Sequence, residues 1–303
     1  MEVRPEEIPA VAQLVHQLCG IVLDASKGYL IEGRLSSLAD AAGCASFSDF
    51  CRTIRTANDP ALRNRVIDAI TTQETLFFRD ESPFEALRHR VLPDLIDSKA
   101  GAPFPKRIRI WSAACSTGQE PYSIAMALCE SIPDIFAWDI NILATDISNA
   151  AIKHASAGRY AKHEIERGMK PQLLLKYFQE ERDHWRIRDS LRALVAFRHR
   201  NLLEPFATLG PFDVIFCRNV AIYFDPATRR DLFLRLTDRL TTDGTLFVGS
   251  AESLTDLGPA FVPLHHCQAV YYQPKKRGGE GEKVRRGEAR TLALDARRKC
   301  GFG

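Results

Sequence analysis

Apolar residues in the first 80 positions recur at helical spacing. Four stretches show the period of three to four residues expected of amphipathic helices. They predict a first helix through Val11, Leu14, Val15, Leu18, Ile21 and Val22, and further helices over residues 30–38, 47–54 and 62–70. No stretch alternates as a half-buried strand does. We therefore expect an all-helical N-terminal domain over residues 1–80.

The pattern changes after Pro83. Short apolar runs now alternate with helical stretches such as residues 122–131 and 228–240. The runs, rich in Val, Ile and Phe, cover residues 107–113, 140–145, 194–197, 212–217, 245–249 and 269–273. Buried strands separated by helices are typical of a doubly wound, Rossmann-like α/β sheet. The prediction is such a domain over residues 81–274, with its ligand at the carboxyl ends of the strands.

One segment of this domain departs from the alternation of strands and helices. Residues 184–189 alternate apolar and polar side chains, which indicates an additional strand. Together with residues 191–199 it predicts a small antiparallel β excursion at about 180–200.

The charge is concentrated at the C-terminus. The chain of 303 residues carries a net charge of +3, but residues 275–303 alone hold ten basic and four acidic side chains, a net of +6. The rest therefore carries −3, which argues against a nucleic-acid-binding body. The Gly-, Arg- and Lys-rich tail is expected to be disordered, as a solubilising segment or, alternatively, as a nonspecific contact for anions.

Cysteine spacing and hydropathy exclude other classes. No apolar run reaches the length that spans a bilayer, and the first ten residues lack the apolar stretch of a secretory signal. The eight cysteines include no Cys-x-x-Cys pair and no zinc-ligand spacing with histidine. We expect a cytoplasmic protein with free thiols, no metal and no membrane insertion.

Two acidic residues follow the first two predicted strands. Glu120 lies where a helix begins, and it either stabilises that helix start or holds a cationic group of a ligand. Asp146 ends the second strand, where a carboxylate accepts hydrogen bonds from ribose hydroxyls. The alternative for Asp146 is an N-cap of the following helix.

Two asparagines follow later strands in the same way. Asn201 and Asn219 offer amides that suit an adenine edge or a ligand carboxylate, although each alone is typical of a turn. Polar side chains at four successive strand ends favour one shared ligand. Residues 71–80 join the two predicted domains, a common place for a binding cleft.

Together these segments resemble a known family, the chemotaxis receptor methyltransferases (CheR family). The similarity extends over about residues 8–273 and is carried by TTQETLFFRD (71–80), WSAACSTGQEPYSIA (111–125), ATDIS (144–148) and FCRNVAIYF (216–224). The resemblance implies an enzyme that uses S-adenosylmethionine to esterify glutamate side chains of chemoreceptors. An alternative is a cofactor-binding signalling module without catalytic activity, and another is a methyltransferase with a small-molecule acceptor.

The resemblance also implies roles for individual residues. Arg79 and Tyr223 are expected at the methyl-transfer centre. The cofactor-binding set is expected to be Gln73, Thr75, Arg79, Glu120, Asp146, Asn201, Leu202, Asn219 and Val220. Family members commonly have Asn where this chain has Gln73.

The implied partner is the cytoplasmic domain of a methyl-accepting chemoreceptor, met by a monomeric enzyme. Lys27 and Arg34 are seven residues apart on the second predicted helix and are expected to dock the acidic receptor. Some family members also bind a peptide at the receptor C-terminus through a glycine-bearing loop of the β excursion. Here residues 179–185 carry three carboxylates and no glycine, so we expect no such tethering.

Overall fold

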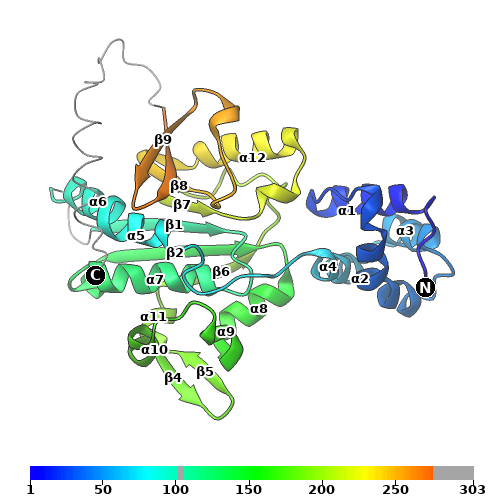
Figure 1. Cartoon of the computed structure of the whole chain (residues 1–303), viewed down its shortest axis with the longest axis horizontal. Helices are drawn as coiled ribbons and strands as arrows, with labels where there is room; N and C mark the ends of the chain where they lie inside the picture. The colour runs from blue at the N-terminus through cyan, green and yellow to red at the C-terminus, as the bar shows by residue number, and fades with distance from the viewer. Residues whose placement is uncertain (102–105, 276–303) are drawn as a thin grey trace.

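The structure is a computed structural model, and it describes residues 1–101 and 106–275. It confirms the predicted fold class, an α/β sheet domain preceded by a helical domain (Figure 1). The basic tail lies, from residue 276 on, outside the described residues. Across the described ranges no helix has the length and hydropathy needed to cross a membrane.

Four helices form the N-terminal domain around a core of their own. They are α1 (Ile8–Cys19), α2 (Gly28–Ala41), α3 (Phe47–Thr56) and α4 (Pro60–Ile70), with the short η1 (Ala25–Lys27) before α2. Local signals fix two of the helix starts. The Ser46 hydroxyl accepts from the backbone N–H of Asp49 at α3, and Asp59 caps α4 with Pro60 in its first turn.

The first helix is shorter than its apolar pattern predicted. It ends at Gly20, whose φ of +77° is the left-handed conformation that glycine adopts without strain. A side chain there would also press on Leu203 and Phe224 of the sheet domain. Ile21 and Val22 therefore leave the helix and run along the other domain.

The main sheet has, within the described residues, seven strands in the order β6-β2-β1-β7-β8-β10-β9. They are β1 (Arg107–Ala113), β2 (Asp139–Asp146), β6 (Val195–His199), β7 (Phe212–Cys217), β8 (Leu240–Phe247), β9 (Phe261–His266) and β10 (Ala269–Pro274). The first five in that order run parallel, whereas β10 is antiparallel to both of its neighbours. The strand order reverses between β1 and β7, which marks the ligand crevice of such sheets.

Helices cover both faces of this sheet (Figure 1). One face carries α5 (Ser82–Ala86), η2 (Leu87–Val91), α6 (Leu92–Ser98) and α7 (Gln119–Ser131), and the other carries α12 (Pro226–Thr237). The connections hold α8 (Asn149–Ala157), α9 (Lys162–Glu166), α10 (Pro171–Tyr177), α11 (Asp189–Arg192) and the single turns η3 (Ile135–Ala137), η4 (Ala221–Tyr223) and η5 (Thr255–Leu257).

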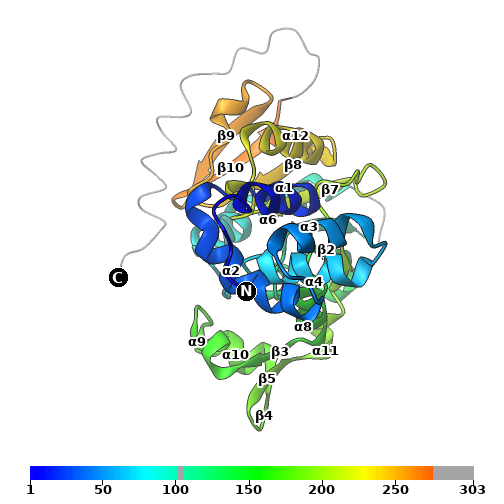
Figure 2. The ribbon, with the colours of Figure 1, turned by 90° about the vertical axis from the view of Figure 1, so that its right-hand side faces the viewer.

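The small antiparallel excursion exists, but its predicted bounds of about 180–200 are wrong. It comprises β3 (Arg159–Ala161), β4 (Phe178–Glu181) and β5 (His184–Ile187) in the order β3-β5-β4. Val195–His199, which the sequence placed both among the runs of the main sheet and in the excursion, pairs with β2 as an edge of the main sheet. Alternation of apolar and polar residues identifies a strand but does not predict which sheet that strand joins. Figure 2 shows this small sheet below the helical domain.

Candidate active site

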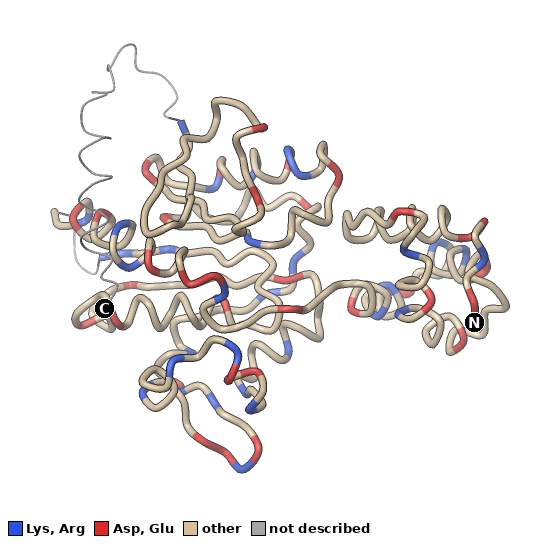
Figure 3. Tube along the Cα trace, viewed as in Figure 1, with Lys and Arg blue, Asp and Glu red and all other residues tan. Residues whose placement is uncertain are grey.

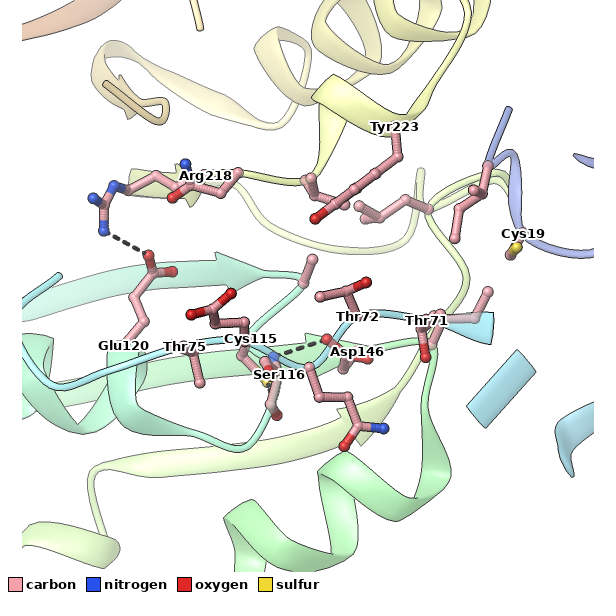
Figure 4. Close-up of a pocket in the computed structure, with 18 of the residues that line it drawn as sticks. Cys19, Thr71, Thr72, Thr75, Cys115, Ser116, Glu120, Asp146, Arg218 and Tyr223 are labelled. Atoms are coloured by element: carbon pink, nitrogen blue, oxygen red, sulfur yellow. Dashed lines mark hydrogen bonds and ion pairs between the residues drawn. The ribbon is translucent and has the colours of Figure 1, made fainter. Parts of the chain in front are cut away.

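A cavity lies where the helical domain meets the carboxyl ends of the main strands (Figure 4). It encloses about 960 Å³ of empty space, including the part open at its mouth. All ten residues singled out from the sequence line it: Gln73, Thr75, Arg79, Glu120, Asp146, Asn201, Leu202, Asn219, Val220 and Tyr223. The structure therefore brings together residues from the linker and from four strand ends.

Asp146 ends β2 at the floor of the cavity. Its Oδ2 accepts from the backbone N–H of Ser116 at 2.8 Å, and its Oδ1 accepts from that of Ser148 at 2.9 Å. Burial raises the pKa of this carboxyl, and the two backbone donors oppose that shift. The alternative role as N-cap of α8 is wrong, because the Ser148 hydroxyl accepts from Ala151 and caps that helix.

Glu120 lies in the first turn of α7, beside the end of β1. Its Oε1 accepts from the Ser112 hydroxyl at 2.8 Å, and its Oε2 accepts from the Arg218 guanidinium at 3.1 Å. Burial raises the pKa of Glu120, while the charge of Arg218 and, less strongly, that of Arg79 work against this shift. The carboxylate is thus held by partners on β1 and after β7.

Arg218 and Glu252 are two buried charges whose role the sequence reasoning missed. Glu252, after β8, accepts from the backbone N–H of Asn219 at 2.8 Å, of Ala221 at 3.1 Å and of Gly249 at 2.7 Å. It thereby fixes the turn after β7, in which Asn219 has a φ of +57°. A side chain at Gly249 would collide with Asn219 and Glu252. For Arg218 the signal in the sequence was a charged residue directly after a buried strand, whereas Glu252 lies five residues beyond β8.

The linker between the domains forms one wall of the cavity. Thr75 and Arg79 are half-buried there, and one guanidinium nitrogen of Arg79 donates to the Glu74 carbonyl at 3.1 Å. The Gln73 amide donates to the Ser148 hydroxyl at 2.9 Å. That hydroxyl donates in turn to Asp68 of α4 at 2.6 Å, so Gln73 belongs to a contact that ties the two domains together.

A second set of hydrogen bonds joins the two domains near the end of α1. The Asn201 amide donates to the Leu18 carbonyl at 2.9 Å, and Val22 donates through its backbone N–H to the Tyr223 carbonyl at 2.9 Å. The Asn201 side chain therefore holds the helical domain as well as lining the cavity. Tyr223 is 36% exposed, which leaves its ring at the mouth.

The expected docking pair on the helical domain is not arranged as the sequence suggested. Lys27 lies in η1, ahead of α2. Arg34 donates to the carbonyls of Ile70 at 2.7 Å and Thr71 at 3.2 Å. Its guanidinium therefore supports the start of the linker, and the docking role of this pair stays a prediction.

Two thiols also line the cavity, those of Cys19 and Cys115. Burial raises the pKa of Cys19 to about 11 and that of Cys115 well above its usual value. Within the part of the chain that the structure describes, no group of His, Cys, Asp and Glu side chains could hold a metal ion.

The polar groups fit S-adenosylmethionine, which combines a ribose, an adenine and a cationic sulfonium. A buried carboxylate, that of Asp146, ends β2 at the place where sheets of this kind bind ribose hydroxyls. A second buried carboxylate, that of Glu120, lines the same cavity. The Ser116 hydroxyl lines the same cavity, buried and without a hydrogen-bond partner among the described residues. Ala114 and Ser116 both have positive φ, which brings the backbone of this loop close to the cavity. The sheet and its site define the class of S-adenosylmethionine-dependent methyltransferases.

Comparison with known proteins identifies the family within this class. Residues 73–267 match "CheR methyltransferase, SAM binding domain", and residues 6–71 match "CheR methyltransferase, all-alpha domain". The chain therefore belongs to the CheR methyltransferase family, and its cofactor is S-adenosylmethionine.

Two relatives by sequence agree with this assignment. The chain is 41% identical to chemotaxis protein methyltransferase 1 of Pseudomonas aeruginosa over 86% of this chain and 95% of that protein. It is 38% identical to chemotaxis protein methyltransferase Cher2 of Pseudomonas putida over the same shares of the two chains. Among solved structures, a TehB-like SAM-dependent methyltransferase of Corynebacterium glutamicum covers 65% of this chain and 100% of its own, at 16% identity and a TM-score of 0.35.

Proposed function

We propose that this protein transfers a methyl group from S-adenosylmethionine to glutamate side chains of chemoreceptor cytoplasmic domains, forming methyl esters in chemotaxis. The observation that carries the proposal is the match of the chain to both domains of the CheR methyltransferase family, and the described residues lining the cavity include no histidine or lysine. A glutamate acceptor needs no general base, because with a pKa of about 4.3 it is almost wholly ionised at neutral pH. Hydroxyl or amine acceptors require a group that removes a proton.

In this proposal the two catalytic residues act by orientation. S-adenosylmethionine supplies an electrophilic methyl group when it is bound. Arg79 holds the acceptor carboxylate by a charge-assisted contact, and the Tyr223 hydroxyl adds a weaker hydrogen bond at the mouth. Alignment of reacting groups is worth as much as about 7–11 kcal/mol in favourable systems.

The remaining lining residues hold the cofactor in this proposal. Asp146 accepts from the ribose hydroxyls, and Glu120 faces the methionyl part. Leu202 and Val220 flank the adenine together with Asn201 and Asn219, while Gln73 and Thr75 close the cavity from the linker. Acidic and basic residues are interspersed along both domains (Figure 3), so docking of the receptor is expected to rest on particular contacts at the mouth.

The experiment is methyl transfer from radiolabelled cofactor into membranes that contain the cognate receptors. The expected product is a labelled ester that releases methanol in alkali. Cofactor binding without any labelling would favour the non-catalytic signalling module, and label in a small molecule would favour a different acceptor. We further expect a monomer, which sedimentation of the purified protein checks. We expect the protein in the cytoplasm, which fractionation of cells checks.

A further inference from the structure

The segment that carries Arg79 has an unusual backbone. Phe78, Asp80 and Glu81 have φ values of +52°, +63° and +22°, although none of them is glycine. Such conformations persist only where surrounding contacts hold them, and they cluster at functional sites. The question is which contacts hold the backbone around Arg79.

Arg218 makes the most buried of these contacts. Its side chain is 1% exposed, and one terminal nitrogen donates both to the Arg79 carbonyl at 2.9 Å and to the Asp80 carboxylate at 2.8 Å. The other terminal nitrogen donates to Glu120 at 3.1 Å. The guanidinium also lies 5.8 Å from the centre of the Phe84 ring. One side chain after β7 thus joins the linker to the carboxylate of α7.

We propose that Arg218 is a positioning residue for methyl transfer: it sets the backbone at Arg79 and Asp80 against Glu120, and so aims the Arg79 side chain at the transfer centre. The inference rests on the proposed function of Arg79. Arg218 itself need not touch the acceptor.

The geometry requires arginine rather than any cation at this position. A guanidinium presents several N–H donors in a fixed plane, so it serves a carbonyl and two carboxylates at once. A lysine ammonium reaches one of these groups as a point charge and leaves the linker contacts unmade. The conservative substitution Arg218→Lys therefore separates charge from geometry.

The central experiment is a double-mutant cycle with Arg218→Lys and Arg79→Ala, assayed with receptor fragments. Arg218→Lys is expected to lower kcat about tenfold or more and to change cofactor affinity only a few-fold. In the Arg79→Ala background the same substitution is expected to cost little further, because Arg218 acts through Arg79. Equal losses in both backgrounds, or a loss confined to cofactor affinity, would overturn the proposal.

A control and a second variant keep this test sharp. Arg109→Lys alters an arginine that also binds a carboxylate, that of Asp139, but at the amino end of the strands and with its side chain 26% exposed, and it is expected to leave kcat unchanged. If Arg218→Lys does not fold, as judged by circular dichroism, Asp80→Ala removes one linker contact while Arg218 stays paired with Glu120. It is expected to lower kcat in the same Arg79-dependent way, and an unchanged kcat would refute the positioning role.

Cofactor binding as a function of pH tests the contact between Arg218 and Glu120, and this test needs no methyl acceptor. Glu120 faces Arg218 and Arg79, with Asp80 beyond Arg218 and the thiols of Cys115 and Cys217 nearby. Arg218→Gln removes a cation, so the acid-side loss of cofactor affinity is expected at higher pH than in the parent protein. An unmoved pH profile would show that Arg218 does not control Glu120. This result stands even if the parent protein forms no ester, which would refute the proposed function alone.

Discussion

The two walls of the cavity differ in how firmly their polar groups are held. On the sheet wall, Asp146 and Glu120 are each 9% exposed, and each accepts two hydrogen bonds from its own domain. On the linker wall, Thr75 and Arg79 are half-buried, and the Arg79 side chain donates a hydrogen bond to the Glu74 carbonyl. A wall whose polar groups are already held in place is adapted to the cofactor, a small ligand that has the same structure in every catalytic cycle. A looser wall suits a macromolecular acceptor that must arrive and leave.

The largest effect is expected on the sheet wall. Asp146→Ala should weaken cofactor binding by about 1–3 kcal/mol, the scale of hydrogen bonds to a charged group. Calorimetry measures this change. Asp139→Ala, at the opposite end of β2, is the matched control and should leave the affinity as it is. Equal affinities for all three proteins would remove Asp146 from the site.

A substitution on the linker wall should separate turnover from binding. Arg79→Ala is expected to lower kcat by roughly tenfold or more, because it removes a charge-assisted contact to the acceptor. Cofactor affinity should change less than kcat. Steady-state kinetics with receptor fragments, together with calorimetry, checks both quantities. Equal losses of kcat and of cofactor affinity would make Arg79 a cofactor-binding residue, and the two walls would then not differ in function.

The pH dependence should differ between binding and chemistry. Burial raises the pKa values of Asp146 and Glu120, so both carboxyls take up a proton at higher pH than exposed ones. Cofactor affinity should therefore fall as the pH drops through these raised values, and the fall should begin at higher pH than exposed carboxyls would give. With saturating cofactor, the methylation rate should be level between about pH 6 and 8, since the acceptor is already ionised. A bell-shaped rate profile centred near pH 6.5 would indicate a titrating base.

The smallest effect is expected away from both walls. In the β4–β5 hairpin only Arg182 and Asp183 separate the two strands, and the hairpin carries the carboxylates of Glu180 and Glu181. Deleting the last several residues of the receptor should leave the methylation rate unchanged, because no tether is expected here. A large drop in rate, or micromolar binding of the isolated tail peptide, would show that the small sheet is a docking site.

The sequence predicted the cavity well because its chemistry sits at strand ends. Asp146, Glu120 and Asn219 follow buried apolar runs, and parallel strands bring their carboxyl ends to one edge of the sheet. Arg218 and Glu252 escaped because their roles depend on distant partners. Arg218 meets residues 98 and 138 positions away, and Glu252 meets an amide 33 positions away.

The misplaced boundaries have physical reasons of the same kind. Residues 194–197 were placed both in the main sheet and, as part of 191–199, in the excursion, because alternation does not reveal the strand that Val195–His199 pairs with, which is β2. The first helix was extended past Gly20 because Ile21 and Val22 continue its apolar period. After Gly20 the backbone turns away instead, so that the Val22 N–H donates to the Tyr223 carbonyl and Ile21 lines the cavity.

The thiols of Cys19 and Cys115 line the cavity in a form that reacts weakly with electrophiles. A thiolate is a strong nucleophile, and a cavity that stores an alkylating agent exposes its own walls to attack. With the pKa of Cys19 raised to about 11, on the order of one thiol in 10,000 is ionised at neutral pH. The Cys115 pKa is raised as well, so its thiol is also kept protonated. The burial that shapes this site thereby also keeps both thiols in their weakly nucleophilic, protonated form.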